Sequence, residues 1–213
     1  MIVDIINNQQ FISSEEELRS LIGYPSEVVK QKDISYIDEH CRDFIARSPF
    51  VCISTSDSEG KCDVSPRGDK AGFIQVVDDK HLVIPERPGN KRMDSLRNIL
   101  STSEIGLVFL IPGLGETLRI NGRAYITKDS DLLKTMAVNG KIPLVGIVVA
   151  VEECFIHCAK AFRRSGLWEP ESWLNNNELP SAAAIISAYA KLEGMTPEVI
   201  AVRLEEGYTQ RLY

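Results

Sequence analysis

The sequence has no excess of positive charge and no long apolar run. Its 24 lysines and arginines are outnumbered by 30 aspartates and glutamates, so the net charge is −6. A general nucleic-acid binder or a protein that binds anionic membranes needs a broad basic surface, and the composition argues against both classes. The longest apolar run, residues 144–151, is far shorter than the ~20 residues of a membrane-spanning helix. It predicts a buried strand instead.

The cysteines show no regular spacing of the kind that a disulfide framework needs, and their number is odd. The five cysteines are Cys41, Cys52, Cys62, Cys154 and Cys158. Such a set predicts no disulfide scaffold. The first residues, MIVDIINNQQFI, lack the basic segment and the long apolar core of a secretion signal, so we expect a cytoplasmic protein with free thiols. The segment CFIHC has no second pair of ligands, and no metal site is predicted.

The first part of the chain is predicted to be helical. Ser13 or Ser14 is a suitable N-cap for SEEELRSLI, and Gly23 directly follows this segment. In a second helix, apolar residues recur at helical spacing up to Ile45, and Pro49 marks the end. Both helices are expected to cover the rest of the fold rather than to carry chemistry.

From Phe50 onward the apolar residues alternate, which is typical of strands separated by turns. The predicted hairpins pair PFVCISTS with CDVSP, AGFIQVV with HLVIP, and EIGLVFLIPG with GETLRINGRAYIT. A central strand is predicted within residues 143–160, because its first half is almost entirely apolar. Six or seven mostly antiparallel strands favour a mainly β (α+β) fold with flanking helices, in which a small barrel closes to remove its edges.

Helical periodicity returns near the end of the sequence. It covers SAAAIISAYAKLEG and then EVIAVRLEEG, which follows a Thr196 cap and Pro197. We therefore predict three parts. They are a helical extension over residues 1–48, a barrel over residues 49–165, and a helical segment over residues 166–213 that packs on the barrel.

The most informative stretch runs from Ser65 to Arg97, and within it residues 85–97 carry four basic residues against two acids in an acidic chain. A Pro-Gly pair predicts a turn, after which Asn90 is a suitable N-cap for a helix. The free N–H groups and the positive dipole end of that helix, with Lys91 and Arg92 beside them, suit a phosphate. Arg87 is held extended before a proline and adds a further cation. The alternative interpretation is a solvated helix face.

Two other segments suit a flat conjugated ligand. SPRGDK places Arg67, with its planar guanidinium, beside a proline and a glycine that let the backbone approach closely. HCAKAFRRSGLW places Lys160 and Arg163 near Trp168, and cations with an aromatic ring can form a wall of a binding site. Trp168 is equally compatible with a core or an interface position.

Together these segments resemble the pyridoxamine 5'-phosphate oxidase-like family of FMN-binding split barrels, over residues 49–160. More narrowly, SPRGDK, IPERPGNKR, RINGRA and HCAKAFRRSGLW in this order resemble a subgroup of FMN-dependent enzymes within that family. The resemblance implies a homodimer with two FMN sites at the subunit interface.

The resemblance also implies cofactor-binding roles for particular residues. The residues that would line the flavin ring are Ser65, Arg67, Gly68 and Asp69. The segment that would hold the phosphate begins at Pro85 and comprises Arg87, Asn90, Lys91 and Arg92. The residues that would reach the flavin of the other subunit are Lys160, Arg163 and Trp168. Arg67 or the partner's Lys160 would stabilise the reduced, anionic flavin.

The implied function is an FMN-dependent oxidoreductase that transfers hydride or electrons between NADH or NADPH and a small acceptor. The chain lacks the C-terminal substrate-phosphate motif of pyridoxamine phosphate oxidase itself, so vitamin B6 oxidation is not predicted. Two alternatives stay open. One is an F420-dependent reductase on the same barrel, and the other is a non-catalytic flavin or haem binding or sensor protein, with His81 or His157 as axial ligand. The scattered histidines argue against a triad hydrolase.

Overall fold

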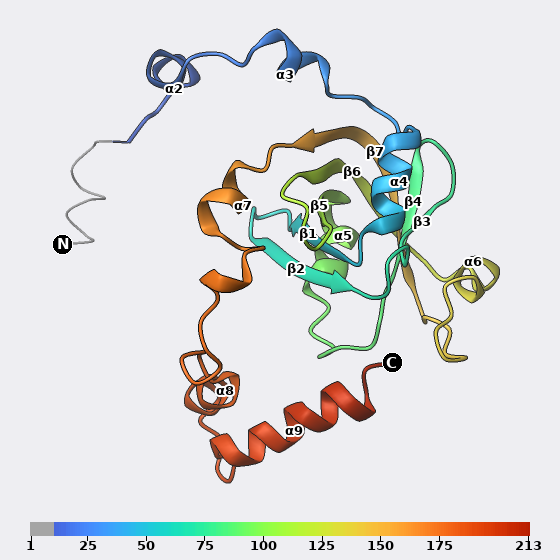
Figure 1. Ribbon diagram of the computed structural model, residues 1–213. Helices are drawn as coiled ribbons and strands as arrows, with labels where there is room; N and C mark the ends of the chain where they lie inside the picture. The colour runs from blue at the N-terminus through green and yellow to red at the C-terminus, as the bar shows by residue number, and fades with distance from the viewer. Residues whose placement is uncertain (1–10) are drawn as a thin grey trace. The chain divides into compact units, whose positions relative to one another are not determined.

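The computed structural model describes residues 11–213, and a seven-stranded sheet organises the fold (Figure 1). The strands are β1 (Phe50–Ser56), β2 (Cys62–Gly68), β3 (Gln75–Val76), β4 (His81–Pro85), β5 (Glu104–Leu110), β6 (Thr117–Thr127) and β7 (Gly146–His157). Their order across the sheet is β2-β1-β5-β6-β7-β4-β3, and every neighbouring pair is antiparallel. The predicted antiparallel fold, its three hairpins and the central position of β7 are confirmed.

The predicted closure of the barrel is wrong. Strands β2 and β3 lie at the two ends of the strand order, and within residues 11–213 no backbone ladder joins them. The sheet is therefore split, with two free edges. Strand β3 has only two residues, a short edge that offers little backbone for unwanted pairing.

The core lies on one face of this sheet, because alternate residues of each strand point inward. Val51 and Ile53 of β1 and Leu107 and Phe109 of β5 are almost completely buried. Further apolar residues come from α4, on which Cys41 and Ile45 pack against the sheet. This packing fixes which side of each strand faces the core.

The described chain also contains helices (Figure 1). The helices are α2 (Glu15–Ile22), α3 (Glu27–Gln31), α4 (Glu39–Arg47), α5 (Asp94–Thr102), α6 (Ser130–Lys134), α7 (Lys160–Ser165), α8 (Ala182–Ala190) and α9 (Pro197–Gln210). A short 3-10 turn spans Pro170–Ser172. Within the described chain, no helix is both long and apolar enough to cross a membrane.

The predicted caps are confirmed at both ends of the chain. The hydroxyl of Ser14 accepts a hydrogen bond from the Glu17 N–H, and that of Thr196 accepts one from the Val199 N–H. The second predicted helix is shorter than expected and begins at Glu39, because Ile34 forms a backbone bridge with Cys154 of β7 instead. Of the described chain, residues 11–33 belong to one unit and Ile34–Tyr213 form another.

Strand β6 contains a bulge at Asn121 and Gly122, where its register with β7 shifts. A Cβ atom on Gly122 would lie 2.1 Å from the backbone oxygen of Ala150. No side chain fits there, so the two longest strands can meet only because residue 122 is glycine.

Gly122→Ala is therefore expected to lower the free energy of unfolding by about 3 kcal/mol or more, since the added methyl group must push two central strands apart. Urea denaturation measures this change. The matched control is Gly207→Ala on α9, where the new Cβ would meet only an Arg211 atom at 3.9 Å. Equal stability of the two variants would contradict the role given to the bulge.

Candidate functional site

Two polar residues of β2 point toward the core. In the register with β1, Ser65 lies opposite Ile53 and Arg67 lies opposite Val51. Directly paired residues share a face of the sheet. Because both β1 residues are fully buried, the Ser65 and Arg67 side chains lie on the inner face, at the edge where the sheet is split.

The segment after β4 meets this edge. Arg67 Nη2 lies 3.3 Å from Glu86 Oε2, and Arg87 Nε lies 2.7 Å from Asp69 Oδ2. Two ion pairs therefore bridge β2 and the end of β4, where backbone pairing is absent. The convergence of the segment around Arg67 with the one around Arg87 agrees with a shared site.

The Arg87–Asp69 pair is largely buried, and both carboxylate oxygens of Asp69 accept hydrogen bonds. The exposed fractions of the two side chains are 15% and 1%. Arg87 Nη1 donates to the Met136 carbonyl at 2.9 Å, and Asp69 Oδ1 accepts from the Lys70 N–H at 2.7 Å and from the Tyr213 hydroxyl at 2.8 Å. Burial raises the pKa of Asp69, but these hydrogen bonds and the charge of Arg87 outweigh it and hold the pKa below its ordinary value.

The Arg67–Glu86 pair is buried but incompletely satisfied. Arg67 Nη1 donates to Ser65 Oγ at 2.6 Å. In the described part of the chain, Arg67 Nε and Glu86 Oε2 are buried without a hydrogen-bond partner. Burial raises the pKa of Glu86, and the nearby charge of Arg67 opposes this only in part. Such an unsatisfied buried pair is a typical feature of a binding site.

The turn after Arg87 differs from the prediction at one point. Helix α5 begins at Asp94, so Asn90 is not its N-cap. The Asn90 side chain accepts from the Arg92 N–H at 3.0 Å, and Lys91 has a positive φ of 61°, which extends the turn. Arg92 is exposed and pairs with Asp94 at 2.7 Å.

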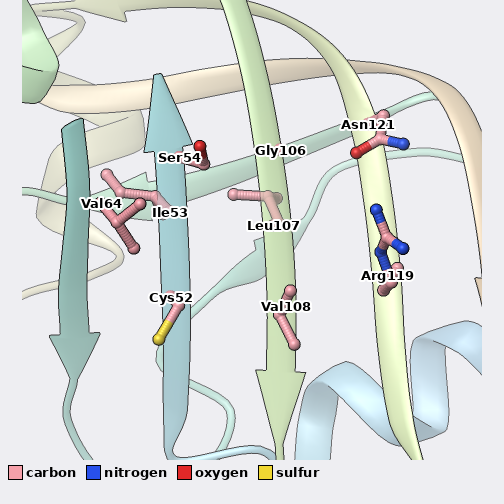
Figure 2. A pocket seen from close by; sticks show the side chains of 9 residues that line it. All are labelled: Cys52, Ile53, Ser54, Val64, Gly106, Leu107, Val108, Arg119 and Asn121. Carbon is pink, nitrogen blue, oxygen red and sulfur yellow. The ribbon is translucent and has the colours of Figure 1, made fainter. Parts of the chain in front are cut away.

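The opposite face of the sheet carries a shallow pocket of about 350 Å³. Figure 2 shows its lining along four adjacent strands, β2, β1, β5 and β6. One row across these strands is formed by Val64, Ser54, Gly106 and Asn121, and a second by Cys52, Val108 and Arg119. Gly68 of β2, opposite Phe50, is exposed on the same side. This face is largely apolar and carries one arginine.

The third predicted group lies elsewhere in the chain. Lys160 and Arg163 are exposed on α7, and Trp168 follows it. The Trp168 ring stacks on Phe162 at 5.6 Å and donates its N–H to the Leu114 carbonyl. Within residues 11–213 no hydrogen bond or ion pair joins this group to Arg67 or Arg87.

Sequence reasoning missed three contributors to the site. Glu86, which follows a buried strand directly, carried a signal as an acid between a proline and an arginine. The Met136 carbonyl and Tyr213 carried none, because their contacts with Arg87 and Asp69 join distant parts of the chain. No group of three possible metal-binding side chains occurs in the described residues.

A split antiparallel sheet with flanking helices, bridged by charged side chains, defines a split-barrel protein. The sequence model of the pyridoxamine 5'-phosphate oxidase family matches residues 37–158, which is more than half of the chain. The chain therefore belongs to this family. No curated protein matches it.

Similar solved structures cover a little over half of the chain. HupZ from Group A Streptococcus has 18% identity and a TM-score of 0.45, and the match covers 56% of this chain and 93% of that one. An FMN-binding protein from Syntrophomonas wolfei has 12% identity and a TM-score of 0.41, and the match covers 55% of this chain and 88% of that one. HutZ, the heme storage protein from Vibrio cholerae, has 12% identity and a TM-score of 0.42, and the match covers 57% of this chain and 93% of that one.

The raised pKa of Glu86 predicts a pH dependence of stability. Between the ordinary value of 4.5 and the raised value, the folded protein keeps a proton that the unfolded chain has released, so stability falls as the pH rises through this window. Glu86→Gln removes this contribution. Urea denaturation across this window should show the wild type losing stability relative to the variant, whereas the exposed control Glu152→Gln should follow the wild type. Parallel profiles for the wild type and Glu86→Gln would contradict the assignment.

Proposed function

We propose that the protein binds FMN and acts as an oxidoreductase, passing hydride or electrons between NADH or NADPH and a small acceptor. The observation that carries this proposal is the buried Arg67–Glu86 ion pair, in which Arg67 Nε makes no hydrogen bond and Glu86 Oε2 has only the ion-pair contact with Arg67, among the described residues. It lies in a chain that belongs to the pyridoxamine 5'-phosphate oxidase family. A buried guanidinium with a free donor suits an electron-rich group on a bound ring.

The residues around the split fit a phosphorylated ligand. Lys91 and Arg92 are exposed on the turn beside Arg87. Among the described residues no hydrogen bond uses Arg87 Nη2, so this nitrogen is left to donate. We assign the phosphate to these three cations and the ring to Ser65 and Arg67.

Bound FMN would supply the hydride chemistry at its N5 atom. The protein supplies orientation and electrostatics. The positive charge of Arg67 favours the reduced, anionic form of a flavin. No observation on the described residues favours haem or F420 over FMN.

The outward face of β2, β1, β5 and β6 supports a homodimer. Val64 is 67% exposed at the edge of the shallow pocket, in a row with Ser54 and Gly106. An apolar sheet face of this kind is stabilised when it is buried against a partner. We infer that two copies meet here and that the partner's Lys160, Arg163 and Trp168 complete the cofactor site.

The experiment that tests the proposed function is identification of the cofactor in purified protein. We expect flavin absorption, FMN released on heating, and steady NADH or NADPH consumption with oxygen or a quinone as acceptor. A Soret band or bound F420 would contradict the cofactor assignment. FMN without nicotinamide oxidation would contradict the enzymatic part alone.

Arg67→Ala is expected to raise the dissociation constant of FMN at least about tenfold, because it removes a charge-assisted hydrogen bond. It also leaves Glu86 as a buried, unpaired charge. The double variant Arg67→Gln/Glu86→Gln removes both charges and keeps the test valid if the single variant unfolds. The control is Arg123→Ala, which breaks an exposed ion pair with Glu104. Flavin titration measures the affinities, and unchanged affinity in both site variants would refute the assignment.

Val64→Glu is expected to dissociate the homodimer, raising its dissociation constant at least a hundredfold (about 3 kcal/mol), because dimerisation would bury an unpaired carboxylate. Light scattering after gel filtration measures the mass. Val202→Glu on α9 is the matched control, since Val202 is 60% exposed and lies outside this face. A Val64→Glu dimer, or a wild-type monomer, would rule out this interface.

A further inference from the structure

The segment after α9 reaches the split in the sheet. The Tyr213 hydroxyl donates to Asp69 Oδ1 at 2.8 Å, and the Arg87 guanidinium carbon lies 5.9 Å from the centre of the Tyr213 ring. The ammonium group of Lys141 donates to the backbone oxygen of Tyr213. One tyrosine thus contacts an anion, a cation and a hydrogen-bond donor that come from three separate parts of the chain.

These contacts differ from those of the helices that precede Tyr213. Helices α8 and α9 pack mainly against each other (Figure 1). They expose apolar side chains such as Ile185 and Val202. The specific polar contacts of the segment with the barrel are concentrated at Tyr213, which makes this residue the point where the C-terminal segment attaches.

We propose that Tyr213 is a positioning residue that contacts both members of the Asp69–Arg87 pair and so holds the turn of residues 86–92 in place. This inference rests on the proposed function, in which that turn binds the phosphate of FMN. In this proposal, Asp69, Arg87 and Lys141 form a surface that binds the chain's own C-terminal segment.

Tyr213 acts on Arg87 through the carboxylate of Asp69. The phenol hydroxyl and the Lys70 N–H both bond to Oδ1, which leaves Oδ2 aimed at Arg87 Nε. The carboxylate therefore has one orientation, and it fixes the plane of the guanidinium. Arg87 Nη1 is fixed at the same time by the Met136 carbonyl. Among the contacts of the described residues, Nη2 is the one guanidinium nitrogen of Arg87 that is left to face an anion.

The tail does not compete with a ligand for these donors. The Tyr213 hydroxyl bonds to the acid of the pair and not to the arginine, so it removes no donor from Arg87. The ring faces the guanidinium carbon, a contact that stabilises the cation without using its N–H groups. An inhibitory tail would instead place an acceptor on Arg87 Nη2.

The test compares Tyr213→Phe, which removes only the hydroxyl group, with Tyr208→Phe, an exposed tyrosine on α9. Two measurements are made on the full chain. Hydrogen exchange reports the rigidity of residues 86–92 and of the Lys70 amide. Titrations with FMN and with riboflavin report whether any loss of affinity concerns the phosphate.

For Tyr213→Phe we expect faster exchange at residues 86–92 and Lys70, and an affinity for FMN about tenfold weaker because the phosphate-binding arginine is less well held. Riboflavin affinity should not change, because riboflavin lacks the phosphate that the turn would bind. A merely structural defect would weaken the binding of both ligands. Tyr208→Phe should behave like the wild type. Unchanged exchange, or tighter FMN binding, would overturn the proposal.

The two proposals fail separately. If the wild type binds no flavin, the proposed function is wrong, and the exchange measurement alone decides whether Tyr213 holds the turn. If FMN binds normally to the wild type and equally well to Tyr213→Phe, the positioning role is wrong and the proposed function stands.

Discussion

The ion pair between Arg87 and Asp69 is the interaction on which the arrangement of the split depends. A free sheet edge is normally covered or paired with another strand. Here β2 is held to the end of β4 by side chains, and the central contact is this pair. A buried ion pair is stable only when its remaining hydrogen-bonding groups are satisfied. The Met136 carbonyl and the Tyr213 hydroxyl satisfy Arg87 Nη1 and Asp69 Oδ1, so the segment after α6, the end of β2 and the C-terminal segment all contact this pair.

The neighbouring Arg67–Glu86 pair is built differently, and the contrast assigns different roles to the two pairs. Both oxygens of Asp69 accept hydrogen bonds. Among residues 11–213, Arg67 Nε makes none, and Glu86 Oε2 has only its ion-pair contact with Arg67. The first pair can therefore serve as a rigid support. The second retains unmet hydrogen-bonding capacity, which a ligand can satisfy. The family resemblance implies that Asp69 lies at the flavin ring, and its contacts with Arg87 and Tyr213 add a supporting role.

Local patterns predicted the elements well, whereas the site depended on contacts across the chain. Alternation in TLRINGRAYIT predicted β6 because a half-buried strand needs it, and Ser14 was predicted as a cap from its immediate neighbours. The start of α5 was misplaced because the Asn90 side chain bonds to the Arg92 N–H within a turn. Sequence patterns do not encode the bond between Tyr213 and Asp69, which are 144 residues apart.

The charge balance of the site determines which cations can bind a phosphate. The two buried pairs are each neutral overall, so most of the net positive charge must come from the exposed turn. Arg92 there pairs with Asp94, but an exposed ion pair contributes only about 0–1 kcal/mol. A charge-assisted hydrogen bond to a phosphate contributes roughly 1.5–3 kcal/mol. Asp94 also lies in the first turn of α5, where its carboxylate would compete with a phosphate for the positive end of the helix dipole. A phosphate can therefore displace Asp94 from Arg92, whereas it cannot displace Asp69 from Arg87.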